Sequence, residues 1–175
     1  MMLSDYQDRW VEDFEAIKSV ITSANRGLEI EAEHIGSTAI PGLSAKPIID
    51  IDLIYAKEED FNIIKANLES IGYFHNGDQG IASREVFKRN NGASHPVLDV
   101  IKHHLYVCHQ DSEELKKHLI FRDKLRSDQA LTKQYGKLKQ RLAAKANQDH
   151  KLYAQLKESE GSEFFKSAMN QKEKE

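Results

Sequence analysis

Two aspartates, Asp50 and Asp52, stand two positions apart in the apolar run 48–55, and this spacing points to metal chemistry. Side chains at positions i and i+2 of a strand share a face, so the two residues would lie about 6–7 Å apart at the backbone. Like charges on a buried strand repel each other unless a cation lies between them. Mg²⁺ prefers a few carboxylates together with water and phosphate oxygens, and it is the ion expected here.

A glycine and a serine upstream, Gly36 and Ser37, suggest what the metal carries. Glycine lets the backbone approach a ligand closely. Ser37 offers a hydroxyl and, at a turn entering a helix, amide donors suited to phosphate oxygens. Lys46 precedes Asp50 by four residues and would add a positive charge. Either motif alone is a weak signal, since Gly-Ser is usually only a turn. Together they predict a metal and phosphate site.

The hydrophobic periodicity predicts the elements that position these residues. Apolar residues at helical spacing indicate helices, and alternation with a period of two indicates strands. We expect helices over 5–25 and 58–70 and three more between 111 and 165. We expect strands over 28–34, 48–55, 73–74, 85–88 and 98–108. This order is typical of an α+β fold in which helices pack on a mixed sheet.

Length and composition bound the class of protein. The 175 residues carry 39% hydrophobic and 30% charged side chains, which is typical of one soluble domain. We expect a core over about 1–110, C-terminal helices over about 111–169 and a flexible tail over 170–175. The net charge of −3 gives no general attraction for nucleic acid or anionic membranes. A single cysteine, Cys108, and the lack of a leader or apolar span indicate a cytoplasmic protein.

With these motifs the sequence resembles the nucleotidyltransferase superfamily, which has the polymerase-beta-like fold. Gly36-Ser37 followed by Asp50-Ile51-Asp52 is similar to the motif of that superfamily. The segments 34–38, 41–43 and 46–52, with 103–107 and 121–126, more narrowly resemble the GrpB-like family. The resemblance extends over about 10–165, nearly the whole chain.

The resemblance implies transfer of a nucleoside monophosphate from a nucleoside triphosphate to an acceptor. Ser37 and its backbone would hold the triphosphate, and Asp50 and Asp52 would bind Mg²⁺. The acceptor is an unidentified small molecule or protein. The sequence pI of about 6.2 and the lack of a basic stretch with interleaved aromatic residues count against nucleic acid.

The third carboxylate that members of the superfamily usually add has no clear counterpart. If 98–107 is one strand, Asp99 shares a face with His103 and lies at the edge of the site; otherwise it closes a turn after Pro96. His104 is the alternative, as a proton acceptor or as a ligand that suits Mn²⁺ or Zn²⁺ better than Mg²⁺. An ordinary strand histidine is an equal reading of His104. The open third position leaves room for a catalytically weak module that binds a nucleotide or coenzyme.

Two arginines and a histidine complete the set of candidate residues. Arg84 and Arg122 are the basic residues favoured for contacts with phosphate or acceptor, although ion pairs with Glu85 or Asp123 are the simpler reading. His34 shares a face with Gly36 if the strand alternates, so it either lines the pocket or packs in the core.

Overall fold

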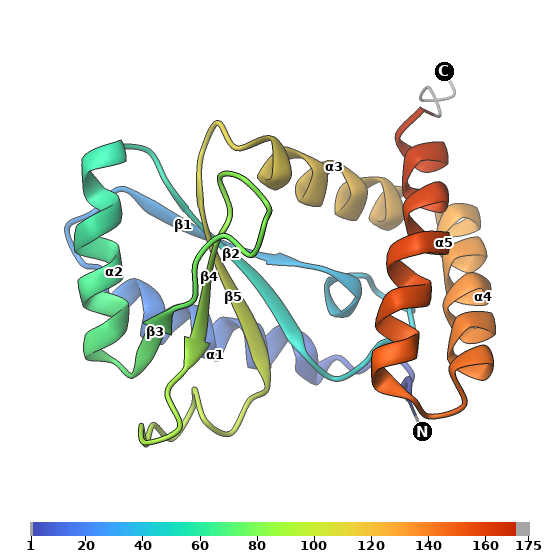
Figure 1. The fold of residues 1–175 in the computed structure, drawn as a ribbon, viewed down its shortest axis with the longest axis horizontal. Coiled ribbons are helices and arrows are strands. Elements are labelled where there is room, and N and C mark those ends of the chain that lie inside the picture. The colour runs from blue at the N-terminus through green and yellow to red at the C-terminus, as the bar shows by residue number, and fades with distance from the viewer. Residues whose placement is uncertain (1, 171–175) are drawn as a thin grey trace.

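The structure is a computed structural model that describes residues 2–170 (Figure 1). Its centre is a mixed sheet of five strands in the order β1-β2-β5-β4-β3. The strands are β1 (Ile30–Ile35), β2 (Ile49–Tyr55), β3 (Tyr73–His75), β4 (Glu85–Arg89) and β5 (His103–His109). The central pair, β2 and β5, is parallel, and the other neighbours are antiparallel. The expected α+β class is therefore confirmed.

Helices surround the sheet and extend beyond it. They are α1 (Arg9–Ala24), α2 (Phe61–Ser70), α3 (Glu113–Ser127), α4 (Gln129–Ala146) and α5 (His150–Asn170), with 3₁₀ turns at Ser37–Ala39 and Glu58–Asp60. Figure 1 shows α4 and α5 side by side at one end of the molecule, with α3 running toward them from the sheet. No helix in the described part of the chain is long and apolar enough to cross a membrane.

One face of the sheet forms the main core. Ile49, Ile51 and Leu53 of β2 are almost fully buried and pack in one cluster with Ile17 of α1 and Ile64 of α2. Side chains alternate along a strand, so the residues between these three point to the opposite face. The apolar face holds β2 in place and thereby fixes Asp50 and Asp52 on the side that faces the C-terminal helices.

The C-terminal helices pack on the segment that follows the first strand. Asp128 caps α4, because its carboxylate accepts hydrogen bonds from the amides of Ala130 and Leu131. Ile40 and Leu43 are buried in a second core cluster with Leu131 and other residues of the helical part. This contact sets α4 and α5 beside the sheet and leaves a cleft between the two parts.

Several expected boundaries differ from the structure. The first helix begins at Arg9, four residues later than expected. The strand expected over 98–108 begins only at His103, because residues 95–101 form turns in which the amides of Asp99 and Ile101 bond to carbonyls of His95 and Val97. Asn170 of the expected tail belongs to α5, and 171–175 lie outside the described residues.

Candidate active site

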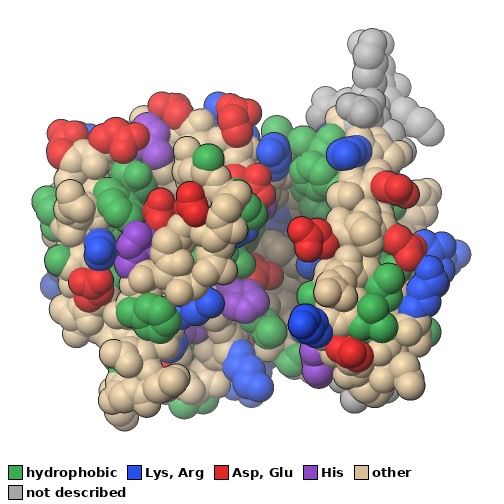
Figure 2. All heavy atoms as spheres, viewed as in Figure 1, with side chains coloured by type: hydrophobic (Ala, Val, Ile, Leu, Met, Phe, Trp, Pro, Cys, Tyr) green, Lys and Arg blue, Asp and Glu red, His purple; other side chains and the backbone are tan. Residues whose placement is uncertain are grey.

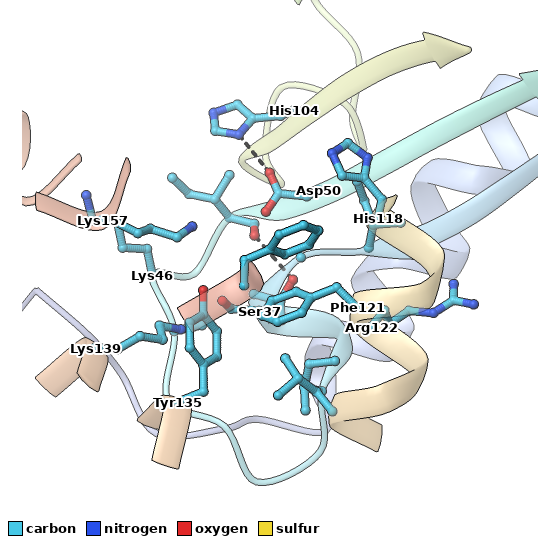
Figure 3. A pocket seen from close by; sticks show the side chains of 18 of the residues that line it. Ser37, Lys46, Asp50, His104, His118, Phe121, Arg122, Tyr135, Lys139 and Lys157 are labelled. Carbon is cyan, nitrogen blue, oxygen red and sulfur yellow. Dashed lines mark hydrogen bonds and ion pairs between the residues drawn. The ribbon is translucent and has the colours of Figure 1, made fainter. Parts of the chain in front are cut away.

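A cavity of about 680 Å³ lies between the sheet and the helices α3, α4 and α5. Figure 2 shows the molecule hollowed between the sheet and the C-terminal helices, and Figure 3 shows the lining from close by. Most residues selected from the sequence line this cavity: Gly36, Ser37, Lys46, Asp50, Arg84, His104 and Arg122. Asp52 has no exposed surface and lies one pleat along β2 from Asp50. The structure therefore brings together a site from segments far apart in the sequence.

Gly36 is required by its contact with Asp50. Its φ of 71° and ψ of −168° lie in a region that essentially only glycine adopts. A Cβ atom on Gly36 would also lie 2.3 Å from Oδ2 of Asp50, which is an impossible contact. The glycine therefore makes room for the carboxylate, and Ser37 begins the 3₁₀ turn immediately beyond it.

Asp50 is paired with His104 across the parallel strands β2 and β5. The two residues are register partners, and Nδ1 of His104 lies 2.8 Å from Oδ1 of Asp50. The carboxylate accepts this hydrogen bond, so Nδ1 carries the proton and Nε2 of a neutral ring is free to accept one. The side chain of His104 is 54% exposed, so this second nitrogen is accessible to a ligand.

Asp52 is held by His118 of α3, a residue that sequence reasoning missed. Nδ1 of His118 lies 2.8 Å from Oδ2 of Asp52. Among the described residues, Oδ1 of Asp52 is buried without a hydrogen-bond partner. Burial raises the pKa of the Asp52 carboxyl, and the hydrogen bond from His118 opposes this rise. This oxygen of Asp52 is therefore available to a ligand.

The two carboxylates fit a divalent cation whose other ligands are water and phosphate oxygens. Within residues 2–170, no group of three or more His, Cys, Asp or Glu side chains is arranged around a metal position. Two carboxylates supplemented by water and phosphate oxygens suit Mg²⁺. A zinc centre normally takes at least three protein ligands, so the donor set favours Mg²⁺ over Zn²⁺.

Asp99 lies outside the cavity. Its two oxygens accept hydrogen bonds from Arg89 at 2.8 and 3.0 Å, and Oδ2 also accepts from the amide of His95 at 2.6 Å. The turn that precedes β5 therefore uses this carboxylate. The structure does not bring Asp99 together with Asp50 and Asp52, and the position opposite Asp50 on β5 belongs to His104.

The two arginines differ in what they offer the cavity. Arg84 stacks its guanidinium 4.7 Å from the ring centre of Tyr106, and its Nε is buried without a hydrogen-bond partner among the described residues. Arg122 forms ion pairs with Glu33 and Asp123, and Figure 3 shows its guanidinium directed away from the cavity. Arg84 can therefore bind an anion, whereas Arg122 mainly attaches α3 to β1.

His34 packs in the core and does not line the cavity. Its ring stacks on Phe14 at 4.8 Å, and its Nε2 lies 3.0 Å from the hydroxyl of Thr38. Burial, together with the charge of Arg126, lowers the pKa of His34 to about 4. His34 is therefore uncharged in the folded protein near pH 7.

We expect this histidine to make the protein sensitive to acid. The unfolded chain binds a proton at His34 below about pH 6.5, whereas the folded chain does so only near pH 4. As the pH falls from about 6.5 to about 4, the free energy of unfolding should therefore decrease by about 1.4 kcal/mol per pH unit. Urea unfolding of His34→Gln should show a flatter pH dependence than the wild type, with the exposed His150→Gln as control. Equal slopes for His34→Gln and wild type would contradict the assignment.

Two further lysines, Lys139 of α4 and Lys157 of α5, line the cavity beside Lys46. Sequence reasoning missed both. Lys139 stands on the buried side of α4, four residues after Tyr135, and a charged residue inside an apolar stripe was the available signal. The cavity thus has a carboxylate end and a lysine end.

The structure has the nucleotidyltransferase fold of the Cid1 poly(U) polymerase. A solved structure of the Cid1 poly(U) polymerase bound to Mg 3′-dATP superposes with a TM-score of 0.52 over 87% of this chain and 49% of that one, at 9% identity. A second Cid1 structure, bound to MgATP, has a TM-score of 0.50 over 78% of this chain and 45% of that one, at 13% identity. At these identities the likeness concerns the fold alone.

The chain belongs to the GrpB family. The family model described as GrpB protein matches residues 1–171. The crystal structure of the conserved protein GrpB from Enterococcus faecalis is 30% identical, with a TM-score of 0.78 over 95% of this chain and 96% of that one. The UPF0157 protein YqkA of Bacillus subtilis is 31% identical over 93% of this chain, which spans only 44% of YqkA. The UPF0157 protein BH1888 of Halalkalibacterium halodurans is 32% identical over 95% of this chain and 81% of its own length.

Proposed function

We propose that this protein is a metal-dependent nucleotidyltransferase that moves a nucleoside monophosphate from a nucleoside triphosphate to a small-molecule or protein acceptor. The observation that carries the proposal is the pair Asp50 and Asp52 beside the Gly36–Ser37 turn, with one buried oxygen of Asp52 left without a partner among the described residues. The Cid1 structures support it, since that protein binds magnesium nucleotides on the same fold.

The residues of the cavity divide the work of binding the triphosphate. Asp50 and Asp52 would hold Mg²⁺, which would neutralise charge on the reacting phosphate and on the departing pyrophosphate. Ser37 would donate its hydroxyl to a phosphate oxygen at the turn. Lys46 and Arg84 would add positive charge along the cavity wall.

His104 would accept the proton of an acceptor hydroxyl, because its Nδ1 is bonded to Asp50 and its Nε2 is free. The acceptor oxygen forms a bond to the α-phosphorus, and the bond from that phosphorus to the pyrophosphate oxygen breaks. The proton of the acceptor hydroxyl passes to Nε2 of His104, while the negative charge of Asp50 at Nδ1 stabilises the imidazolium. His104 would thus act as the general base, the role proposed for a third carboxylate in the superfamily.

Calorimetric titration tests the proposal. We expect the protein to bind a nucleoside triphosphate in the presence of Mg²⁺, and a chelator should weaken this binding. Asp50→Asn should weaken it at least about tenfold, because a charged contact contributes about 1.5–3 kcal/mol. Asp99→Asn removes a carboxylate outside the cavity and should leave binding unchanged. Equal effects of the two substitutions would overturn the proposal.

A binding module that holds a nucleotide or coenzyme without transfer is the second candidate. The observation that favours it is the histidine, rather than an acid, at the β5 position opposite Asp50. Pyrophosphate release across a panel of acceptors separates the two candidates. Release that is lost in His104→Ala supports transfer, whereas tight metal-dependent binding without any release supports the module.

A further inference from the structure

Three lysines from separate segments meet on one wall of the cavity. Lys46 precedes β2, Lys139 lies in α4 and Lys157 lies in α5. Figure 3 shows all three on the side of the cavity away from His118. We call Lys46, Lys139 and Lys157 the lysine cluster. Positive charges at close range repel each other, so this arrangement requires groups that offset the repulsion.

Lys139 is the member that is hardest to explain as a structural residue. It is only 2% exposed, and its Nζ donates a hydrogen bond to the carbonyl of Ser44 at 2.7 Å. Burial, with the nearby charge of Lys157, lowers the pKa of Lys139 to about 7. A lysine needed only to fill this position would be better replaced by an apolar side chain, because burial of the amine is costly.

Aromatic rings offset part of this charge. The Nζ of Lys46 lies 4.5 Å from the ring centre of Tyr153, and the Nζ of Lys139 lies 5.6 Å from that of Tyr135. Within residues 2–170, none of the three lysines forms an ion pair with a carboxylate. A ring face attracts an ammonium group less strongly than an anion does. The cluster therefore has unused capacity for an anion.

We infer that the lysine cluster is an anion subsite that binds a phosphate group of the ligand independently of the metal site. The inference rests on the proposed function for the kind of ligand that enters the cavity. Three lysine amines from three segments can donate hydrogen bonds to several oxygens of a phosphate. The phosphate belongs either to the tail of the triphosphate or to an acceptor that itself carries a phosphate.

Binding of inorganic pyrophosphate in a chelator-containing buffer tests the subsite without the metal. We expect calorimetry to show binding to the wild type. Lys139→Met and Lys157→Met should each weaken it at least about tenfold. Lys133→Met, on an exposed position of α4, should not. Because Lys139→Met also removes the bond to Ser44, Lys157→Met is the decisive variant if the former unfolds.

The outcomes separate this inference from the proposed function. No pyrophosphate binding by the wild type, or equal binding by Lys157→Met and Lys133→Met, overturns the subsite even if Mg²⁺-dependent nucleotide binding is found. Competition between pyrophosphate and a nucleoside triphosphate assigns the subsite to the triphosphate tail. Lysine-dependent pyrophosphate binding alongside the triphosphate assigns it to the acceptor. Both of the latter results support the subsite.

Discussion

Replacing Asp52 with asparagine is expected to stabilise the protein in the absence of divalent cations. The folded state raises the pKa of this carboxyl by burial, so ionisation of Asp52 works against folding. The stability that protonated Asp52 contributes is fully present below the unfolded pKa of 3.8. It is lost as the pH rises through the higher pKa of the folded state. An asparagine side chain at this position would keep an oxygen for His118 but carry no charge. At pH 7 with chelator, Asp52→Asn should therefore unfold at a higher urea concentration than the wild type, and the difference should disappear in acid.

The same substitution should abolish metal-dependent nucleotide binding. Because Asp52 has no exposed surface, its charge acts in a poorly screened environment, and we expect at least about a 100-fold loss of affinity. Asp60→Asn, at a buried aspartate outside the cavity, is the matched control and should bind as the wild type does. Lower stability of Asp52→Asn together with undiminished binding would show that Asp52 is a structural residue.

Replacing Gly36 with alanine should damage both the fold of the site and its binding. Backbone strain at its φ of 71° and ψ of −168° costs about 1–3 kcal/mol. The added Cβ would also displace the carboxylate of Asp50, which lies 2.3 Å away. Urea unfolding should show a loss of at least about 2 kcal/mol. Calorimetry should show at least about a 100-fold loss of nucleotide affinity, because Asp50 no longer holds its position.

Gly42→Ala separates these two causes. Gly42 also has a positive φ, 77°, but a Cβ there would meet nothing within 4 Å. This variant should therefore lose stability through strain while keeping nucleotide affinity. If Gly36→Ala and Gly42→Ala bind nucleotide equally well, the contact between Gly36 and Asp50 has no role in the site.

Local patterns in the sequence predicted the parts of the site that lie on one element or on adjacent ones. The strand β2 and the shared face of Asp50 and Asp52 follow from its alternating apolar residues. The need for glycine at position 36 was expected from a ligand, and the structure adds a second cause in the carboxylate of Asp50. The sequence indicated His104 as a candidate by its residue type. The register that pairs His104 with Asp50 is a property of the folded sheet.

Local sequence patterns do not predict contacts between distant segments. His118 meets Asp52 across 66 positions of sequence, and nothing in the spacing on α3 indicates that partner. The strand expected from 98 was wrong because Leu98 is buried from within a turn, and an apolar residue in a buried turn has the same signature as one in a strand. The lysine cluster likewise depends on how α4 and α5 pack against the sheet.

A crystal structure with Mg²⁺ and a non-hydrolysable nucleoside triphosphate tests the central claim most directly. We expect the ion on Asp50 and Asp52, with the previously unpartnered oxygen of Asp52 among its ligands. The phosphates should lie at the turn that begins with Ser37. A nucleotide bound outside the cavity, or an ion that contacts neither aspartate, would contradict the account.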